Sequence, residues 1–180
     1  MSGRNGSGGC PFCKTEMAST RVARLLRPIA IVIVALLSLV GTPTLAAQAS
    51  AQDSAYAVVT RLFDAMRTRD TTTMRILFLS NASMQSLTAD GVSVAPVDGW
   101  IASVGRARAG LVLDERLANP IVHIDGDLAT IWVDYWFFAG DRFSHCGVDA
   151  FQLARRTDGW RIFSVVDTRR TVDCAAPPPR

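Results

Sequence analysis

An aspartate lies between two tryptophans in a long apolar segment, and this alternation places chemically useful groups on one face of a strand. Residues 128–138 are predicted to form that strand, in which Trp132, Asp134 and Trp136 point the same way. Indole rings supply flat apolar walls for a ring-shaped ligand, and a carboxylate between them can take up or release a proton. The segment therefore predicts part of a pocket for a flat ligand.

His145 and Asp149 share a face of the next predicted strand. A turn centred on Gly140-Asp141 would set Asp134 opposite Gly147 and bring both carboxylates and the imidazole into one patch. A carboxylate beside an imidazole is what general acid–base catalysis requires, so these three residues are candidate catalytic groups. A three-residue turn would shift the pairing by one residue and scatter the group over both faces of the sheet.

The same residues also have structural interpretations. The two aspartates could pair with arginines and only hold the sheet, and the candidate partners are Arg142, Arg169 and Arg170. The tryptophans could be core or dimer contacts, and His145 could be a hydrogen-bonded structural residue. The sequence holds no GxSxG, P-loop, GxGxxG or HExxH motif, and its two histidines lack a metal-ligand spacing. We therefore expect no metal and no cofactor.

The formal net charge of +3 is unevenly distributed along the chain. Residues 1–51 contain five of the basic residues and one of the acidic residues, which leaves 14 basic and 15 acidic residues from position 52 onward. A nearly neutral domain lacks the positive field that holds a phosphate backbone, so we expect no nucleic-acid partner.

The first 51 residues are typical of a secretory leader. Three arginines (Arg21, Arg24 and Arg27) precede the uncharged apolar run 29–40, and Ala49-Ser50-Ala51 offers a small-residue cleavage site. We expect cleavage after Ala51, or after Ala49, and a secreted or periplasmic domain. The alternative is an uncleaved leader, which would be the only membrane contact; the apolar run is short for a span of about 20 residues.

Residues 1–16 precede this leader and include the pair Cys10 and Cys13. Met17 would begin a signal peptide of ordinary length, so we favour a start there, in which case residues 1–16 are not translated. The other interpretation is a redox or metal-binding CxxC motif. Two further cysteines, Cys146 and Cys174, follow the leader; in an oxidising compartment they either form a disulfide or stay as free thiols, one of them buried.

Hydrophobic periodicity predicts helices first and strands afterwards. The predicted helices cover 54–69, capped by Asp53 or Ser54, then 71–79 and 97–106; a short strand covers 81–87, and a four-strand meander covers 111–124, 128–138, 143–153 and 160–168. Helices followed by an antiparallel sheet define the α+β class. We expect one domain over residues 52–173 and an unstructured tail over 174–180.

Several strings resemble the nuclear transport factor 2-like superfamily, and in particular its SnoaL-like and putative lumazine-binding-type members. They are residues 145–153 (HCGVDAFQL), 157–162 (TDGWRI) and 167–170 (DTRR), supported by Tyr56, Leu62 and Phe63 on the first helix. The resemblance covers about residues 53–173. It implies a cone in which a curved antiparallel sheet wraps around the N-terminal helices, with a pocket at the open end. It transfers no catalytic motif.

In such a cone the first and third helices line the pocket, so Tyr56 and Trp100 join Trp132 and Trp136 as candidate ligand-binding residues; Trp100 could equally be a core anchor. The favoured interpretation is an exported domain that binds a small hydrophobic or aromatic ligand. One alternative is a cofactor-independent isomerase, cyclase or hydrolase that uses an Asp/His pair. The other is a non-catalytic, homodimerising module, which needs the pocket filled by Phe63, Phe137 and Phe151.

Overall fold

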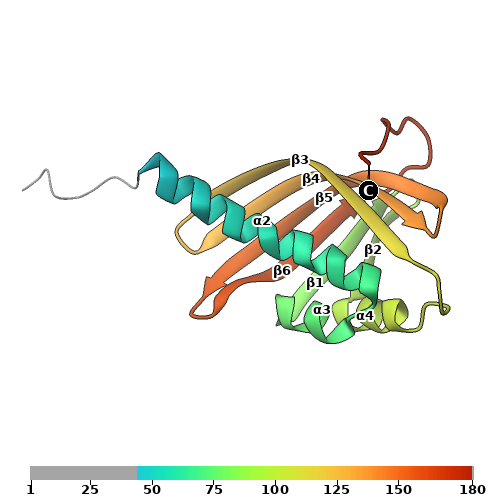
Figure 1. Ribbon diagram of the computed structural model, residues 1–180, viewed down its shortest axis with the longest axis horizontal. Coiled ribbons are helices and arrows are strands. Elements are labelled where there is room, and N and C mark those ends of the chain that lie inside the picture. Colours follow the sequence, from blue (N-terminus) through green and yellow to red (C-terminus); the bar gives the residue numbers. More distant parts are fainter. Residues whose placement is uncertain (1–43, 180) are drawn as a thin grey trace, which may run out of the picture. The chain divides into compact units, whose positions relative to one another are not determined.

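A long helix lies along one face of a curved sheet in the computed structural model, which describes residues 44–179 (Figure 1). The elements in chain order are α2 (Leu45–Thr68), α3 (Thr71–Leu77), β1 (Phe78–Thr88), β2 (Gly91–Pro96), α4 (Val97–Gly105), β3 (Leu113–Asp125), β4 (Leu128–Ala139), β5 (Arg142–Arg156) and β6 (Gly159–Thr168). Helices gathered against a sheet confirm the predicted α+β class.

The sheet has six strands in the order β2-β1-β6-β5-β4-β3. Strand β1 runs parallel to β6, and all other neighbours are antiparallel, so the sheet is mixed. The predicted antiparallel meander is therefore correct for β3 to β6 and incomplete at the other edge. The sequence missed β2 because all six of its residues are exposed, which leaves no inward apolar pattern to read.

The apolar stripe of α2 packs on the sheet and forms the main core. Val59, Leu62 and Met66 are fully buried there against Ile131 and Phe151 of the sheet. We call this side of the sheet the inner face, and the opposite side the outer face. The helix ends where Arg69 adopts a left-handed conformation (φ 58°), with its N–H pointing to the carbonyls of the last turn.

Helix α2 begins earlier than the periodicity predicted. Its N-cap is Thr44, whose hydroxyl accepts a hydrogen bond from the Ala47 N–H, and neither Asp53 nor Ser54 caps it. Residues 45–50 are all exposed, and the first buried residue is Ala55. Among residues 44–179, no helix combines the length and apolar character of a membrane span. The predicted leader charge, apolar run and CxxC motif lie outside the described residues.

The C-terminal segment, residues 174–179, forms no helix or strand and lies on the outer face. Cys174 forms a disulfide with Cys146 of β5. The Trp136 indole N–H donates to the Ala175 carbonyl (2.7 Å), and the Arg116 guanidinium donates to the Pro178 carbonyl (3.3 Å). These contacts fix the tail across β4 and β3.

Candidate functional site

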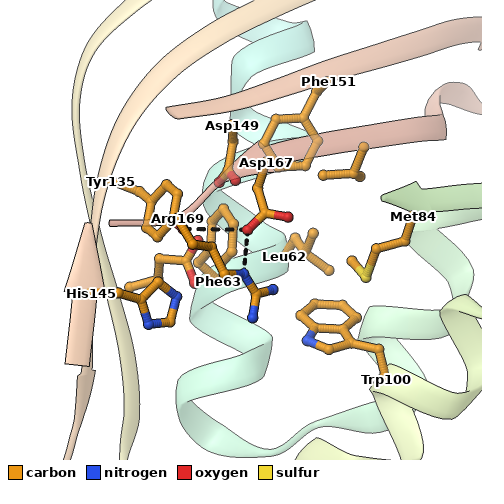
Figure 2. Close-up of a pocket in the computed structure, with 12 residues that line it drawn as sticks. Leu62, Phe63, Met84, Trp100, Tyr135, His145, Asp149, Phe151, Asp167 and Arg169 are labelled. Atoms are coloured by element: carbon orange, nitrogen blue, oxygen red, sulfur yellow. Dashed lines mark hydrogen bonds and ion pairs between the residues drawn. The ribbon is translucent and has the colours of Figure 1, made fainter. Parts of the chain in front are cut away.

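A small cavity lies on the inner face of the sheet, between the strands and the helices. Its volume is about 50 Å³, which is room for a few water molecules. Polar groups line it from the sheet, and Figure 2 shows apolar side chains, among them Leu62, Met84 and Trp100, on the side opposite His145 and Tyr135. The polar lining residues are Glu115 (β3), Tyr135 (β4), His145 and Asp149 (β5), Asp167 (β6) and Arg169.

A bulge in β5 decides which residues enter this cavity. Next to the turn, Phe138 pairs with Phe143, but the following pair is Phe137 with His145, so Ser144 is an extra residue. The bulge shifts the remaining pairing by one residue. As a result His145 and Asp149 share the inner face with Tyr135 rather than with the tryptophans of β4.

Asp149 is the most deeply buried acid in the cavity, with only 3% of its surface exposed. Its Oδ2 atom has no hydrogen-bond partner among the described residues. Burial raises the pKa of this carboxyl to about 7, and the neighbouring Asp167 charge adds to the effect. A buried carboxyl without its full set of partners opposes folding unless a ligand or proton satisfies it.

Glu115 reaches the same point from β3. Burial raises its pKa well above the ordinary value, and the charge of Asp149, with which it is in hydrogen-bond contact, raises the pKa further. Two carboxyl groups in hydrogen-bond contact cannot both ionise easily, so one proton is shared between them near neutral pH. We call Glu115 and Asp149 the carboxyl pair.

Asp167, in contrast, has several donors. Its carboxylate accepts hydrogen bonds from the Ser86 hydroxyl and from the Arg169 Nε atom (2.6 Å), and the Tyr135 hydroxyl lies 3.3 Å away. The single Tyr135 hydroxyl hydrogen has a shorter path to the Thr168 carbonyl (2.8 Å). Asp167 and Arg169 therefore form an ion pair at the cavity wall (Figure 2).

Gly147 makes this arrangement sterically feasible. A Cβ atom at this position would lie 1.8 Å from the Thr168 carbonyl oxygen and 2.8 Å from the Tyr135 ring. Only glycine allows the Tyr135 ring and the end of β6 to approach β5 this closely. The backbone of β5 therefore controls where Tyr135 and Arg169 lie.

His145 stands beside the rings of Tyr135 and Phe137, with centroids 5.6 Å and 5.1 Å from its own. Its Nδ1 atom is 2.9 Å from the Ser144 hydroxyl. Burial lowers the pKa of the imidazole, and the Arg169 charge lowers it further. His145 is therefore neutral at physiological pH.

The sequence of the domain matches one family over most of its length. The model of the family described as "Putative lumazine-binding" matches residues 50–166. The chain belongs to this putative lumazine-binding family. A comparison with curated proteins gave no match.

Solved structures with the nuclear transport factor 2-like fold resemble this lumazine-binding-family domain. A nuclear transport factor 2-like protein of unknown function from Shewanella baltica has a TM-score of 0.54 at 18% identity, covering 66% of this chain and 92% of its own. A putative dehydratase of the same superfamily from Streptomyces avermitilis has a TM-score of 0.56 at 16% identity, covering 69% and 99%. The beta subunit of a putative aromatic-ring-hydroxylating dioxygenase from Novosphingobium aromaticivorans has a TM-score of 0.58 at 12% identity, covering 71% and 94%. At these identities the likeness shows the fold alone.

The family domain brings together only part of the predicted constellation. His145, Asp149 and Trp100 line the cavity. Asp134 pairs with Val148, not Gly147, so the predicted register is wrong beyond the bulge. Asp134 lies on the outer face, where its Oδ2 atom accepts a hydrogen bond from the Asn119 side chain (2.9 Å).

The remaining predicted ligand-binding residues lie elsewhere. Trp132 is 53% exposed on the outer face, and Trp136 packs there against Phe138 and Cys146. Tyr56 lines a larger hollow of about 530 Å³ between α2, β3 and the C-terminal prolines. We call it the edge hollow, because β3 is the edge strand of the sheet, and it shares Phe63 and Glu115 with the small cavity.

Four polar residues of the cavity were not among the sequence candidates. They are Glu115, Tyr135, Asp167 and Arg169. Glu115 did carry a signal, because it lies between Leu113 and Leu117 at the spacing of one strand face. An acid inside an apolar face predicts a special environment. In the described part of the chain, His, Cys, Asp and Glu residues form no group that could hold a metal ion.

Proposed function

We propose that this chain is an exported small-molecule-binding domain whose ligand contacts the carboxyl pair in the cavity. The observation that carries the proposal is the buried Asp149 Oδ2 atom, which has no hydrogen-bond partner among the described residues. A purely structural core would gain stability by replacing such a group with an apolar one. A buried acid that faces a cavity beside other titratable groups is typical of a binding or catalytic site.

The lining suits the edge of a flat, hydrogen-bonding ring. Phe63, Trp100 and Phe151 provide apolar surface, and the acids provide acceptors for N–H or O–H groups of a ligand. The family description points to a pteridine ring such as lumazine. The cavity of about 50 Å³ holds only the edge of such a ring. The rest of the ligand would extend past Phe63 and Glu115 into the edge hollow between α2 and β3, where Tyr56 lies.

Isothermal titration calorimetry with lumazine and a panel of similar flat heterocycles tests this proposal. We expect at least one ring to bind, and Asp149→Asn to weaken it at least tenfold. Asp134→Asn is the matched control, because Asp134 is a carboxylate on the outer face of the same sheet, and it should bind like the wild type. Binding that survives Asp149→Asn unchanged, or a panel in which no ring binds, would count against the proposal.

The export part of the proposal concerns the leader and the start of α2. Residues 44–50 are exposed and Ala51 is half-buried, so cleavage after Ala51 would remove no fully buried side chain from the described part of the chain. Gln52, the new first residue, would still anchor the helix, because its side-chain amide donates to the Val122 carbonyl (2.9 Å). Intact mass of protein from its native host should give a chain that begins at Gln52, or at Ser50. A chain that keeps residues 29–45 and sediments with membranes would contradict cleavage.

A second candidate function is acid–base catalysis in the same cavity. It is favoured by the carboxyl pair, because a group with a pKa of about 7 can both accept and donate a proton at neutral pH. Asp134 has no part in it. Incubating a bound ring compound in D2O tests this function. Deuterium incorporation or isomerisation that Asp149→Asn abolishes would support an isomerase, cyclase or hydrolase. A ligand that stays unchanged would rule out catalysis on that compound and leave only the binding function.

A homodimer is the remaining proposal, and the outer face supports it. Ile121 and Trp132 pair across β3 and β4, and each is 53% exposed. Exposed apolar groups of this size often mark an interface. Sedimentation equilibrium should show a dimer that Trp132→Glu dissociates, and a wild-type monomer at high concentration would refute it.

A further inference from the structure

The charges around the cavity determine what kind of ligand it can accept. Every titratable or charged lining group comes from the strands or from the residue after β6: Glu115, Tyr135, His145, Asp149, Asp167 and Arg169. The lining residues from α2, α4 and β1 are uncharged: Leu62, Phe63, Trp100 and Met84. The net charge of the cavity lining therefore depends on these six side chains.

Two of the six compensate each other, and two are neutral. The Arg169 Nε atom lies 2.6 Å from the Asp167 carboxylate, so this ion pair brings no net charge. His145 is neutral because burial and Arg169 lower its pKa, and Tyr135 is neutral because burial raises its pKa. The carboxyl pair is left without a cation of its own among the lining residues.

The carboxyl pair also has acceptor sites to spare. If Glu115 donates its proton to Asp149, the Asp149 carboxylate still has further lone-pair positions. Among the described residues, Oδ2 of Asp149 receives no donor. Adding an anion here would place it against an acid without a counter-charge, which is unfavourable in a buried site.

We propose that the cavity selects a planar cation whose edge carries two N–H donors, such as an amidinium or a protonated amino-heterocycle, bound by Asp149 with its partner Glu115. This inference rests on the proposed function, because it names the ligand class of the same site. An amidinium edge has only a few heavy atoms, which suits a cavity of about 50 Å³. Its two parallel N–H groups match a carboxylate in the bidentate manner of arginine, and the Phe63 and Trp100 rings in the lining favour a cation.

This ligand class brings a defined dependence on pH. Below about pH 7 the carboxyl pair is fully protonated and offers no charge; above it, the pair carries one negative charge. A cation binds the charged form, so its binding displaces a proton. Affinity should rise about tenfold per pH unit up to about pH 7 and become constant above it. The Asp167–Arg169 ion pair does not change its net charge in this process.

Benzamidinium, benzamide and benzoate form a matched set of probes, because they share one ring and differ in the charge and donors of one group. Calorimetry with the wild type should show binding of benzamidinium that is about tenfold tighter at pH 8 than at pH 6. Benzamide should bind at least tenfold more weakly than benzamidinium, and benzoate should not bind. Asp149→Asn should lose benzamidinium binding, while Glu115→Gln keeps a donor to Asp149 and should retain it.

The outcomes separate this inference from the proposed function. Binding of lumazine or benzoate that depends on Asp149, without binding of benzamidinium, would overturn the inference and leave a ligand-binding cavity. Benzamidinium binding that persists in Asp149→Asn, or that does not change between pH 6 and pH 8, would also overturn it. Asp134→Asn serves as the control for non-specific attraction of a cation to surface carboxylates.

Discussion

Asp149 of β5 lies directly opposite Asp167 of β6, so two carboxyl groups enter one cavity from neighbouring strands. Like charges opposite each other weaken a sheet unless each has a partner that reduces the repulsion. Here the partners differ: Asp167 pairs with Arg169 and Ser86, whereas Asp149 shares a proton with Glu115. One acid is an ordinary ion-pair member, and the other is a proton-sharing group.

The buried acid makes stability depend on pH in an unusual direction. The pKa of Asp149 is about 7 in the folded protein and near 3.8 when unfolded, so the folded state binds the extra proton between these values. The free energy of unfolding should therefore fall as pH rises from about 4 to about 7, with up to about 4 kcal/mol from Asp149 alone, and it should keep falling above pH 7 because Glu115 holds its proton there. Urea unfolding at pH 5 and pH 8 measures the difference. Asp149→Asn should flatten the profile and stabilise the protein at pH 8, whereas Asp134→Asn should keep the wild-type slope.

Gly147 should tolerate no side chain. Gly147→Ala places a Cβ atom against the Thr168 carbonyl, and we expect the free energy of unfolding to fall by about 2–3 kcal/mol or more. Gly99→Ala in α4 is the control, because a Cβ there meets its nearest neighbour, the Pro96 side chain, only at 3.9 Å. That change should stabilise by about 0.5–1 kcal/mol. Equal effects of the two substitutions in thermal unfolding would disprove the steric account.

The disulfide should contribute to stability through the tail. Cys174→Ser should lower the free energy of unfolding by about 2–4 kcal/mol, because it opens a loop of 28 residues. Cys174 is the better position to change, since Cys146 is buried. The reduced wild-type protein should have the same free energy of unfolding as the variant. Host-purified native protein in which both thiols alkylate freely would show that the bond does not form.

Arg169 should hold down two pKa values at once. Its charge lowers the pKa of His145 and also opposes the upward shift of the Asp149 pKa. Arg169→Gln should therefore raise both, which NMR titration of the imidazole and carboxyl signals can follow. Arg170→Gln is the control, because Arg170 is the next residue and does not line the cavity. A shift of one pKa without the other would mean that Arg169 acts on only one group.

The sequence predicted the strands well where turns delimit them. Asp125-Gly126 and Asp158-Gly159 mark the starts of β4 and β6 within one or two residues, because both turns carry glycine at positive φ. The start of α2 was wrong, since exposed residues before Ala55 continue the helix without adding to its apolar stripe. Periodicity detects burial, and it cannot detect a helical turn that buries nothing.

The site was less predictable, because a single residue decides it. Alternation correctly placed His145 and Asp149 together. The extra residue Ser144, however, changed the β4 residues that share their face from Trp136 and Asp134 to Phe137 and Tyr135. No local pattern of residue types marks that bulge. Two residues that complete the site come from elsewhere in the chain: Glu115 lies on β3, which β4 separates from β5, and Arg169 follows β6. Their proximity to Asp149 depends on the tertiary pairing of the sheet.

The parallel pairing of β1 with β6 also constrains the order in which the molecule can assemble. Strand β1 is the first strand made, yet its inner neighbour is the last, and Ser86 reaches Asp167 across 81 positions of sequence. Such long-range contacts are slow to form because a large loop must close first. During synthesis the hairpin of β1 and β2 therefore forms before β6 exists, and the β6-facing edge of β1 stays unpaired until then. A chain that stops short of Thr168 would lack both the neighbour of β1 and one wall of the cavity.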